Sequence, residues 1–491
     1  MLDKKTIWLN FLVLMVSVLM TGTHLAAEVK NNPDAQMPEQ HGSLHNPHNP
    51  LVLAAGDGIA DDTVALQKAL DSGKGRVFLP HGKYLISETL RIPSNSGFYG
   101  MGTIIQNDES KNIILVANAS NVAIEGIKLT RAEGKMYTSK HGITVQNSDF
   151  VTIKNVHIEN NRSDMSSIRI NDSNHAVIEN CTIINYKRIA IDDRTENDLF
   201  GYAFHCIDGT GIIIRRCVGT VIRNNRIIEK NLIPNKENQE KYNLGTLTEG
   251  RKPSKPGKIA IQQNTFERNY VDNWHQGSAV LISGTTTDFT ILNGNYIESC
   301  AQGFDLHSDY VIVTDNIINH AMIGIKLTHG TKHLIISNNL LTNIDLWAMY
   351  LGPGALSREA AEGKEGKPPV AANLDQGIII ANNIISDFGF GHEYWNWGGR
   401  FEDGEGSYAI VLNDGQLEEN PPLTDVLISN NIIYDTGRDK VIIDGQLKKV
   451  PPRYKYAVYF GQRDNKPQNV LFNNNMFHPG AAGVSNMPIQ P

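Results

Sequence analysis

Residues 303–316, GFDLHSDYVIVTDN, place two groups capable of acid–base chemistry at the start of an otherwise repetitive segment. Asp305 and His307 alternate with Phe304 and Leu306, so the carboxylate and the imidazole share one face of a predicted strand. An imidazole titrates near neutral pH, and a neighbouring carboxylate orients it. The pair is therefore a candidate for proton transfer in catalysis.

Polar groups also stand at the matching position of the next two predicted strands. Aligning segments 303–309, 324–330 and 347–353 on their apolar residues puts Asp305, Lys326 and Tyr350 in one outward column. Strands of one sheet lie about 4.8 Å apart, so the column would span about 10 Å. Trp274-His275 enters the preceding repeat and supplies a supporting contact. The candidate catalytic residues are Lys326, Tyr350, His307, Asp305 and His275.

Two other interpretations of this cluster stay open. Asp–Lys neighbours across strands are common surface pairs of small energetic value. Asp305, His307 and Asp309 also offer oxygen and imidazole ligands that suit a divalent cation such as calcium. The sequence contains no dense cage of carboxylates, so it does not determine whether a cofactor binds.

Further polar and aromatic residues are candidates for substrate binding. In our alignment Asp192 directly follows Arg169 in the outward column, several repeats before Asp305, and these groups suit either subsites of a groove or a surface ion-pair ladder. Insertions at 230–257, 353–376 and 389–407 would wall the groove, and the last one contains FGFGHEYWNWGGRF, whose aromatic rings suit stacking on sugars. The candidate substrate-binding residues are Arg169, Asp192, Arg194, His329, Trp347, Trp395 and Trp397.

A sequence repeat must position these groups. Short β-branched segments such as VTIKN, VIVTDN and VLISNN recur, each with an Asn near its end, at intervals of 21 to 48 residues. Self-similarity of this kind indicates a repeat architecture, and stacked Asn side chains can bond one another in every coil. The pattern predicts an all-β, single-stranded right-handed parallel β-helix, a solenoid with an asparagine ladder. The predicted ladder residues are Asn155, Asn180, Asn225, Asn264, Asn295, Asn316, Asn339, Asn383, Asn431 and Asn475.

The segment before the repeats predicts a cap. In residues 57–86, DGIADDTVALQKALDSGKGRVFLPHGKYLI, Asp61 or Asp62 precedes a helix that extends to Leu70, and Gly73 and Gly75 end it. The order DG, DDT, short helix and VFLP strand resembles the N-terminal cap of the pectate-lyase-like β-helix superfamily. With the repeats, the resemblance covers residues 55–480. It implies an N-terminal capping helix and a superfamily of polysaccharide lyases, polygalacturonases, C5-epimerases and phage tailspikes.

The remaining features bound location and partners. Residues 1–27 resemble a secretory signal peptide, which predicts a secreted or periplasmic protein with no membrane contact after cleavage. A net charge of −7 argues against nucleic-acid binding. We expect a monomer with a flexible leader at 28–50, cap and first coils at 51–118, a β-helix at 119–482 and a tail at 483–491. Cys206 and Cys217 could pair, or all four cysteines, including Cys181 and Cys300, are buried thiols.

Three classes of function fit these residues. A lyase that cleaves a uronic-acid polysaccharide needs a cation at the carboxylate and acid–base groups beside it, and Lys326 with His307 and Tyr350 matches that need best. A glycoside hydrolase, transglycosidase or epimerase is the second hypothesis, although the NTD, GHG and RIK triplets of polygalacturonases and the DPH motif of alginate epimerases are absent. The third is a glycan-binding or structural protein. In each case the partner is a polysaccharide, and the sequence favours an anionic one.

Overall fold

The computed structural model describes residues 54–187, 210–230, 265–267, 270–272, 278–282, 289–328, 330–353, 374–389, 407–414, 421–436, 441–448, 452–461 and 465–489. The predicted signal peptide and leader lie outside these residues. The chain divides into residues 1–47 and 48–491, and every described residue belongs to the second unit. Within that unit, no described helix has the length and apolar content needed to cross a membrane.

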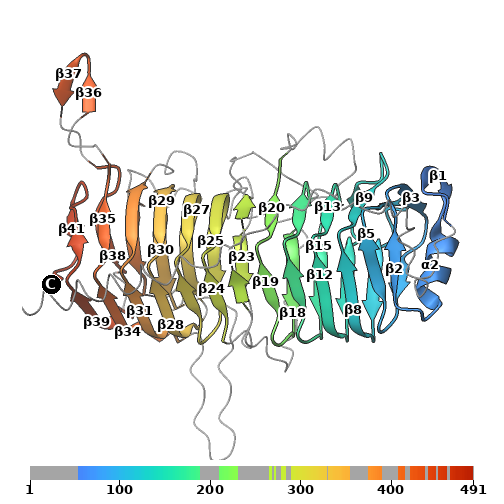
Figure 1. Ribbon diagram of the computed structural model, residues 1–491. Coiled ribbons are helices and arrows are strands. Elements are labelled where there is room, and N and C mark those ends of the chain that lie inside the picture. Colours follow the sequence, from blue (N-terminus) through green and yellow to red (C-terminus); the bar gives the residue numbers. More distant parts are fainter. Residues whose placement is uncertain are drawn as a thin grey trace, which may run out of the picture. The chain divides into compact units, whose positions relative to one another are not determined.

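The second unit is built from parallel strands that stack coil upon coil (Figure 1). One sheet consists of thirteen described strands in chain order, and each pairs with the strand of the next coil. Its strands are β2 (Arg76–Leu79), β5 (Gly97–Gly100), β8 (Ser120–Glu125), β12 (Asp149–Lys154), β16 (Val177–Glu179), β19 (Val221–Arg223), β21 (Thr265–Glu267), β24 (Ile291–Asn293), β26 (Ile312–Thr314), β28 (Lys332–Ser337), β31 (Gln376–Ala381), β34 (Thr424–Ser429) and β39 (Gln468–Asn473).

The largest described sheet holds nineteen strands in two parallel ladders, which the long strands β25 and β27 join. The first ladder runs through β1 (Asp57–Asp61), β3 (Lys83–Ile86), β6 (Thr103–Gln106), β9 (Lys128–Arg131), β13 (His157–Glu159), β17 (Thr182–Ile184), β20 (Arg226–Ile228), β22 (Tyr270–Asp272), β25 (Tyr296–Leu306), β27 (Ile317–Thr328), β29 (Leu340–Ile344), β32 (Ile384–Phe388), β35 (Ile432–Tyr434) and β40 (Met476–Phe477). The second runs from β23 (Ser278–Ile282) through the ends of β25 and β27 to β30 (Trp347–Gly352), β33 (Tyr408–Leu412), β38 (Tyr456–Phe460) and β41 (Gly483–Ser485).

The early coils complete their turn with a smaller parallel sheet of five described strands. These are β4 (Leu90–Ile92), β7 (Ile114–Ala117), β11 (Ile143–Gln146), β15 (Ser166–Asn171) and β18 (Thr210–Arg215). Two short pairs lie outside the main sheets: β10 (Tyr137–Thr138) with β14 (Arg162–Ser163), and the antiparallel hairpin of β36 (Val441–Ile443) and β37 (Gln446–Lys448).

Alternation along each strand separates an apolar interior from a polar exterior. In β27, Ile325 and Leu327 are fully buried in the core, whereas Lys326 between them is half-buried on the other face. Phe304, Ile325 and Met349 pair in register on successive coils and form one inward-facing column. The β-branched and apolar residues that recur in the sequence therefore form continuous interior columns. Cys181, Cys217 and Cys300 are buried, and Cys206 lies outside the described residues.

The asparagine ladder is present across the later coils. The side-chain amide of Asn383 donates to Oδ1 of Asn431 at 2.9 Å, and Oδ1 of Asn383 accepts from the amide of Asn339 at 3.0 Å. These contacts link six asparagines, from Asn295 through Asn316, Asn339, Asn383 and Asn431 to Asn475. Asn225 follows β19, two strands before β24 in the same sheet, at the register position of the ladder, and it bonds the backbone of Cys181 and Ile178.

The prediction was wrong for Asn155 and Asn180. Both are exposed and adopt φ of 54°, the left-handed conformation that Asn tolerates better than most residues. The strand register puts Val156 and Cys181, one residue later, at the ladder position of those coils. The sequence pattern of an Asn before two apolar residues therefore occurs both at the ladder position and at the turn residue just before it. Asn264 lies outside the described residues.

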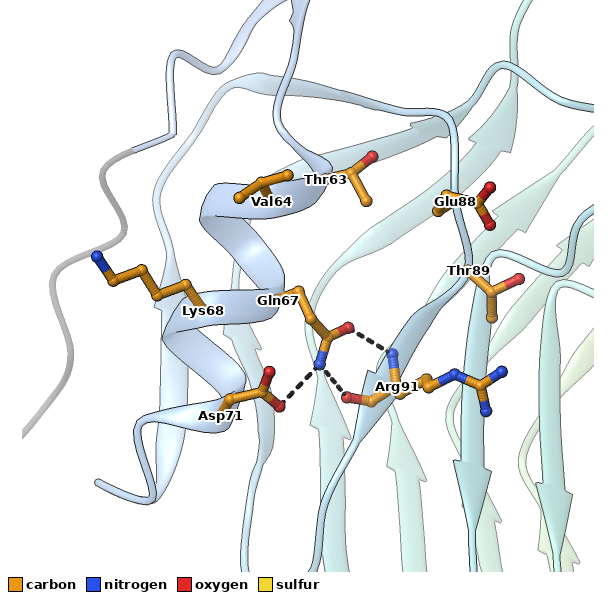
Figure 2. Close-up of a pocket in the computed structure, with 8 residues that line it drawn as sticks. All are labelled: Thr63, Val64, Gln67, Lys68, Asp71, Glu88, Thr89 and Arg91. Carbon is orange, nitrogen blue, oxygen red and sulfur yellow. Dashed lines mark hydrogen bonds between the residues drawn. The ribbon is translucent and has the colours of Figure 1, made fainter.

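The predicted cap is a helix, α2 (Thr63–Asp71), followed by Gly73 and Gly75 at φ of 68° and 91°. Asp62 is its N-cap residue, but its carboxylate accepts from the backbone of Ala55 and Gly56 rather than from the helix. Gln67 bonds both the N–H and the C=O of Arg91 at 2.9 Å, which occupies the open edge of strand β4 (Figure 2). The depression drawn there is thus part of an edge-capping contact.

Candidate active site

The predicted outward column exists. Asp305 on β25 pairs in register with Lys326 on β27, and Lys326 pairs with Tyr350 on β30. Parallel strands lie about 4.8 Å apart, so the three side chains stand on consecutive coils over about 10 Å. The register confirms the alignment made on the apolar residues, because any slip by one residue would turn these groups into the core.

Asp305 is the centre of a compact charged cluster. Nε2 of His307 lies 2.7 Å from Oδ1 of Asp305, and Nζ of Lys326 lies 3.4 Å from the same oxygen. The three side chains are between 10% and 20% exposed, so each keeps only a small surface in contact with solvent. The backbone N–H of His307 donates to the carbonyl of Ile282 at the end of β23, which fixes the imidazole beside the column. A carboxylate held this way orients the imidazole and pairs with the ammonium.

Tyr350 stands at the next coil with a contact that the sequence did not indicate. The side-chain amide of Asn413 donates a hydrogen bond to the Tyr350 hydroxyl oxygen at 2.5 Å. The ring of Trp347 stacks on that of Tyr350 at 4.9 Å between centroids. Gly352 gives the ring room, since a Cβ there would stand 2.8 Å from Tyr350 Cε1. Because the oxygen accepts this bond, the hydroxyl proton of Tyr350 stays free to be donated. The same amide would then stabilise the phenolate that forms when Tyr350 gives up its proton.

Thr328 is a second residue that sequence reasoning missed. It follows Lys326 by two positions on the same strand, so it shares the outward face of the site. Its side chain is buried, and its hydroxyl has no hydrogen-bond partner within the described part of the chain. A buried hydroxyl without a partner is costly, and a bound ligand or water would satisfy it. The signal in the sequence was its spacing from Lys326, two residues.

The metal site considered at Asp305, His307 and Asp309 is not formed. Asp309 turns to the next coil, where its carboxylate accepts from the backbone N–H of Lys332 at 2.9 Å and pairs with its ammonium at 3.0 Å. Among the described residues no three His, Cys, Asp or Glu side chains gather in a way that would hold a metal ion. Asp309 does not join Asp305 and His307, because the chain turns beyond the end of β25 and its carboxylate bonds Lys332 instead.

Arg169 lies on the early coils, on the outward face of β15. Sheet order from β16 to β26 puts it four coils before Asp305, or about 19 Å by strand spacing. The prediction that Asp192 stands next to Arg169 was wrong. Strand β15 pairs with β18, which places Ile213 beside Arg169. Burial, with a contribution from Arg169, lowers the pKa of nearby His141 from 6.5 to about 4.

Several predicted site residues lie outside the described residues and keep their predicted roles only as hypotheses. They are His275, Asp192, Arg194, His329, Trp395 and Trp397. The structure therefore brings together Asp305, His307, Lys326, Tyr350 and Trp347, adds Thr328 and Asn413, and separates Arg169 and Asp309 from the cluster.

Comparisons of sequence match the early part of the chain. Residues 53–232 match a family model described as rhamnogalacturonase A/epimerase, pectate lyase-like. Over 49 residues the chain is 41% identical to the preneck appendage protein of Bacillus phage PZA and 45% identical to the pre-neck appendage protein of Bacillus phage B103. Each of these matches spans 10% of this chain and 6% of the phage protein, so the chain corresponds to a small part of those relatives.

Comparisons of structure extend over most of the chain. The catalytic unit of an α-1,3-glucanase from Streptomyces thermodiastaticus is similar at a TM-score of 0.50 and 10% identity, covering 90% of this chain and 70% of that one. The A-module of a mannuronan C-5 epimerase from Azotobacter vinelandii gives a TM-score of 0.47 at 11% identity, covering 90% of this chain and 96% of that one. The parallel coils and the asparagine ladder are those of a parallel β-helix, and its early part, residues 53–232, is similar to the pectate lyase-like family model.

Proposed function

We propose that the protein is a lyase that cleaves a uronic-acid polysaccharide by β-elimination. One observation carries the proposal: Asp305, His307 and Lys326 form a bonded cluster one coil away from a tyrosine whose oxygen accepts from Asn413. This set supplies a cation, an oriented imidazole and a phenol on one outward face. The superfamily supports action on polysaccharides, and the choice of elimination rests on these side chains.

β-Elimination breaks two bonds of a uronate residue. A base removes the proton from C5, the C4–O bond breaks, and its electron pair leaves on the glycosidic oxygen, which then takes a proton. The products are a 4,5-unsaturated uronate and a new free hydroxyl on the departing sugar. A positive charge at the carboxylate stabilises the carbanion-like state at C5, so the site must place a cation, a base and an acid within one sugar residue.

Each role has a candidate in the cluster. Lys326 lies 3.4 Å from the carboxylate of Asp305, and a second carboxylate, that of the substrate, suits the same ammonium. His307 is oriented by Asp305 and is assigned as the base at C5. Tyr350, with Asn413 at its oxygen, donates the proton to the leaving oxygen. The hydroxyl of Thr328 completes the carboxylate contact beside Lys326.

Absorbance of the unsaturated product tests the reaction. The mature protein is incubated with alginate, polygalacturonate, hyaluronan, chondroitin and glucuronan, each with and without a chelator. A rise in ultraviolet absorbance that Lys326→Ala and Tyr350→Phe abolish is the expected result. Lys332→Ala is the matched control, because Lys332 also pairs with an aspartate but belongs to the other sheet. Chelator sensitivity would reveal a required divalent cation.

Other outcomes identify the alternatives. New reducing ends without absorbance would show a hydrolase, and inversion at C5 without cleavage would show an epimerase, which begins with the same proton abstraction. Binding without any reaction would show a glycan-binding protein. Export to the periplasm or the medium is part of the proposal and rests on the predicted signal peptide at residues 1–27. Mass measurement of the exported protein checks that cleavage.

A further inference from the structure

A cluster of aromatic side chains continues the site toward the later coils. We call Trp347, Tyr408, Tyr456 and Tyr459 the aromatic platform. Trp347, Tyr408 and Tyr456 pair in register on β30, β33 and β38, and Tyr459 is in register with Tyr350 through Val411. Tyr350 itself belongs to the same apolar cluster. The platform thus begins at the coil of Tyr350 and extends over the next two coils.

The platform is separate from the β-helix interior. Its residues pack with Met322, Ile323 and Leu346 in a cluster distinct from the main core. The ring of Tyr408 stacks on that of Tyr459 at 4.3 Å between centroids and lies 6.3 Å from that of Tyr456. Tyr408 is 8% exposed, whereas Trp347, Tyr456 and Tyr459 are half-buried. The central ring is therefore held in place by its neighbours, which keep part of their surface accessible.

Charge changes abruptly along this face. The strands that carry Asp305 and Lys326 present an acid and a cation outward, whereas WAMYLG, YAIVL and YAVYF, the sequences of β30, β33 and β38, contain no charged residue. A uronate carboxylate placed over these three strands would meet no cation from them. A sugar ring without a carboxylate would bury its apolar C–H face against the tyrosines and reach their hydroxyls with its own.

We propose that the aromatic platform binds an uncharged sugar unit next to the uronate held at Lys326, so that the substrate alternates a uronate with a neutral sugar. The inference rests on the proposed function, because that function places the uronate. Continuity supports it, since Tyr350 belongs to both the site and the platform cluster. From Tyr350 to Tyr459 is two coils, about 10 Å, which accommodates the sugar adjoining the cleaved bond.

Initial rates on two groups of polymers test the substrate class. Hyaluronan, unsulfated chondroitin and rhamnogalacturonan backbone alternate a uronate with an uncharged sugar, whereas polygalacturonate, alginate and glucuronan consist of uronates only. We expect a higher kcat/KM on at least one alternating polymer than on every homopolymer. Tyr456→Ala and Tyr459→Ala should raise KM on that polymer about tenfold, the loss of one aromatic contact, and leave kcat nearly unchanged.

Controls separate the platform from folding and from the reaction. Tyr459→Leu keeps apolar volume and should lose affinity as Tyr459→Ala does, while Tyr434→Ala, a half-buried tyrosine of β35 outside the platform, should bind normally. Calorimetric binding of oligosaccharides of each polymer is measured alongside. Weaker binding by both Tyr456 and Tyr459 variants supports the platform even if no polymer is cleaved. Unchanged binding and KM in these variants, tighter binding of homouronides, or no binding of any alternating polymer overturns it.

Discussion

Replacing Asn383 by Ala should strongly destabilise the later coils. The Asn383 side chain makes four hydrogen bonds: it donates to Ile336 O at 3.0 Å and to Asn431 Oδ1 at 2.9 Å, and it accepts from the backbone N–H and the side-chain amide of Asn339. It is fully buried. Alanine removes all four hydrogen bonds and provides no replacement partner for the buried groups.

The size of the effect follows from what each partner retains. The Asn339 amide keeps Val313 O, and Asn431 Oδ1 keeps the N–H of residue 383, so these losses cost about 0.5–1.5 kcal/mol each, as does the contact with Ile336. The backbone N–H of Asn339 loses its acceptor in a buried position, which costs about 1–3 kcal/mol. The free energy of unfolding should fall by about 5 kcal/mol in total.

Urea unfolding of three variants checks this reasoning. Asn475→Ala, at the half-buried end of the ladder, should cost clearly less than Asn383→Ala, because water can reach the groups it leaves. Asn319→Ala, on the outward face of β27, should cost about 1 kcal/mol or less, because water can replace its hydrogen bonds to Glu298 and Asn343. Equal losses for Asn383 and Asn319, or a larger loss at Asn475, would refute the argument that buried ladder bonds stabilise these coils.

Three further effects are expected. Asp305→Asn should lower kcat about 10–100-fold, because it removes a charge-assisted bond to His307 worth about 1.5–3 kcal/mol. An unchanged kcat would show that the Asp305–His307 pair has no role in catalysis. Burial lowers the His141 pKa from 6.5 to about 4, so between these pH values the unfolded chain binds a proton that the folded chain does not. About 3 kcal/mol of folding stability present above pH 6.5 should therefore be lost as the pH falls toward 4. In urea titrations, His141→Gln should remove that pH dependence. Gln67→Ala should cost about 1–2 kcal/mol in the same assay, because two hydrogen bonds to the edge strand at Arg91 are lost; no change would show that the edge needs no partner.

The sequence predicted the site column because two periodicities agreed. Alternation assigned Asp305 and Lys326 to the outside of their strands, and the repeat placed those strands on adjacent coils. Regions with inserted residues between repeats did not allow the same alignment. The alignment put Asp192 beside Arg169, whereas strand pairing identifies Thr210–Arg215 as the neighbour of β15.

The sequence pattern did not predict contacts between residues that are far apart in the chain. Asn413 bonds Tyr350 from 63 residues away, and Tyr408 stacks on Tyr459, which lies 51 residues further along the chain. No local period relates these residues, because insertions of differing length separate their coils. Asp309 shows the converse, since its spacing from His307 suggested a shared ligand set and its backbone turned it toward Lys332.

By itself, the sequence determined the solenoid, the capping helix, the interior columns and the order Asp305, Lys326, Tyr350, because hydrophobic alternation and repeat spacing are local properties that a chain must satisfy in every coil. Only the tertiary structure decided which Asn enters the ladder, that Thr328 and Asn413 join the site, and that tyrosines of separate coils form one platform. Those outcomes depend on strand register and on contacts between coils, which stacking fixes after the local pattern has already been satisfied.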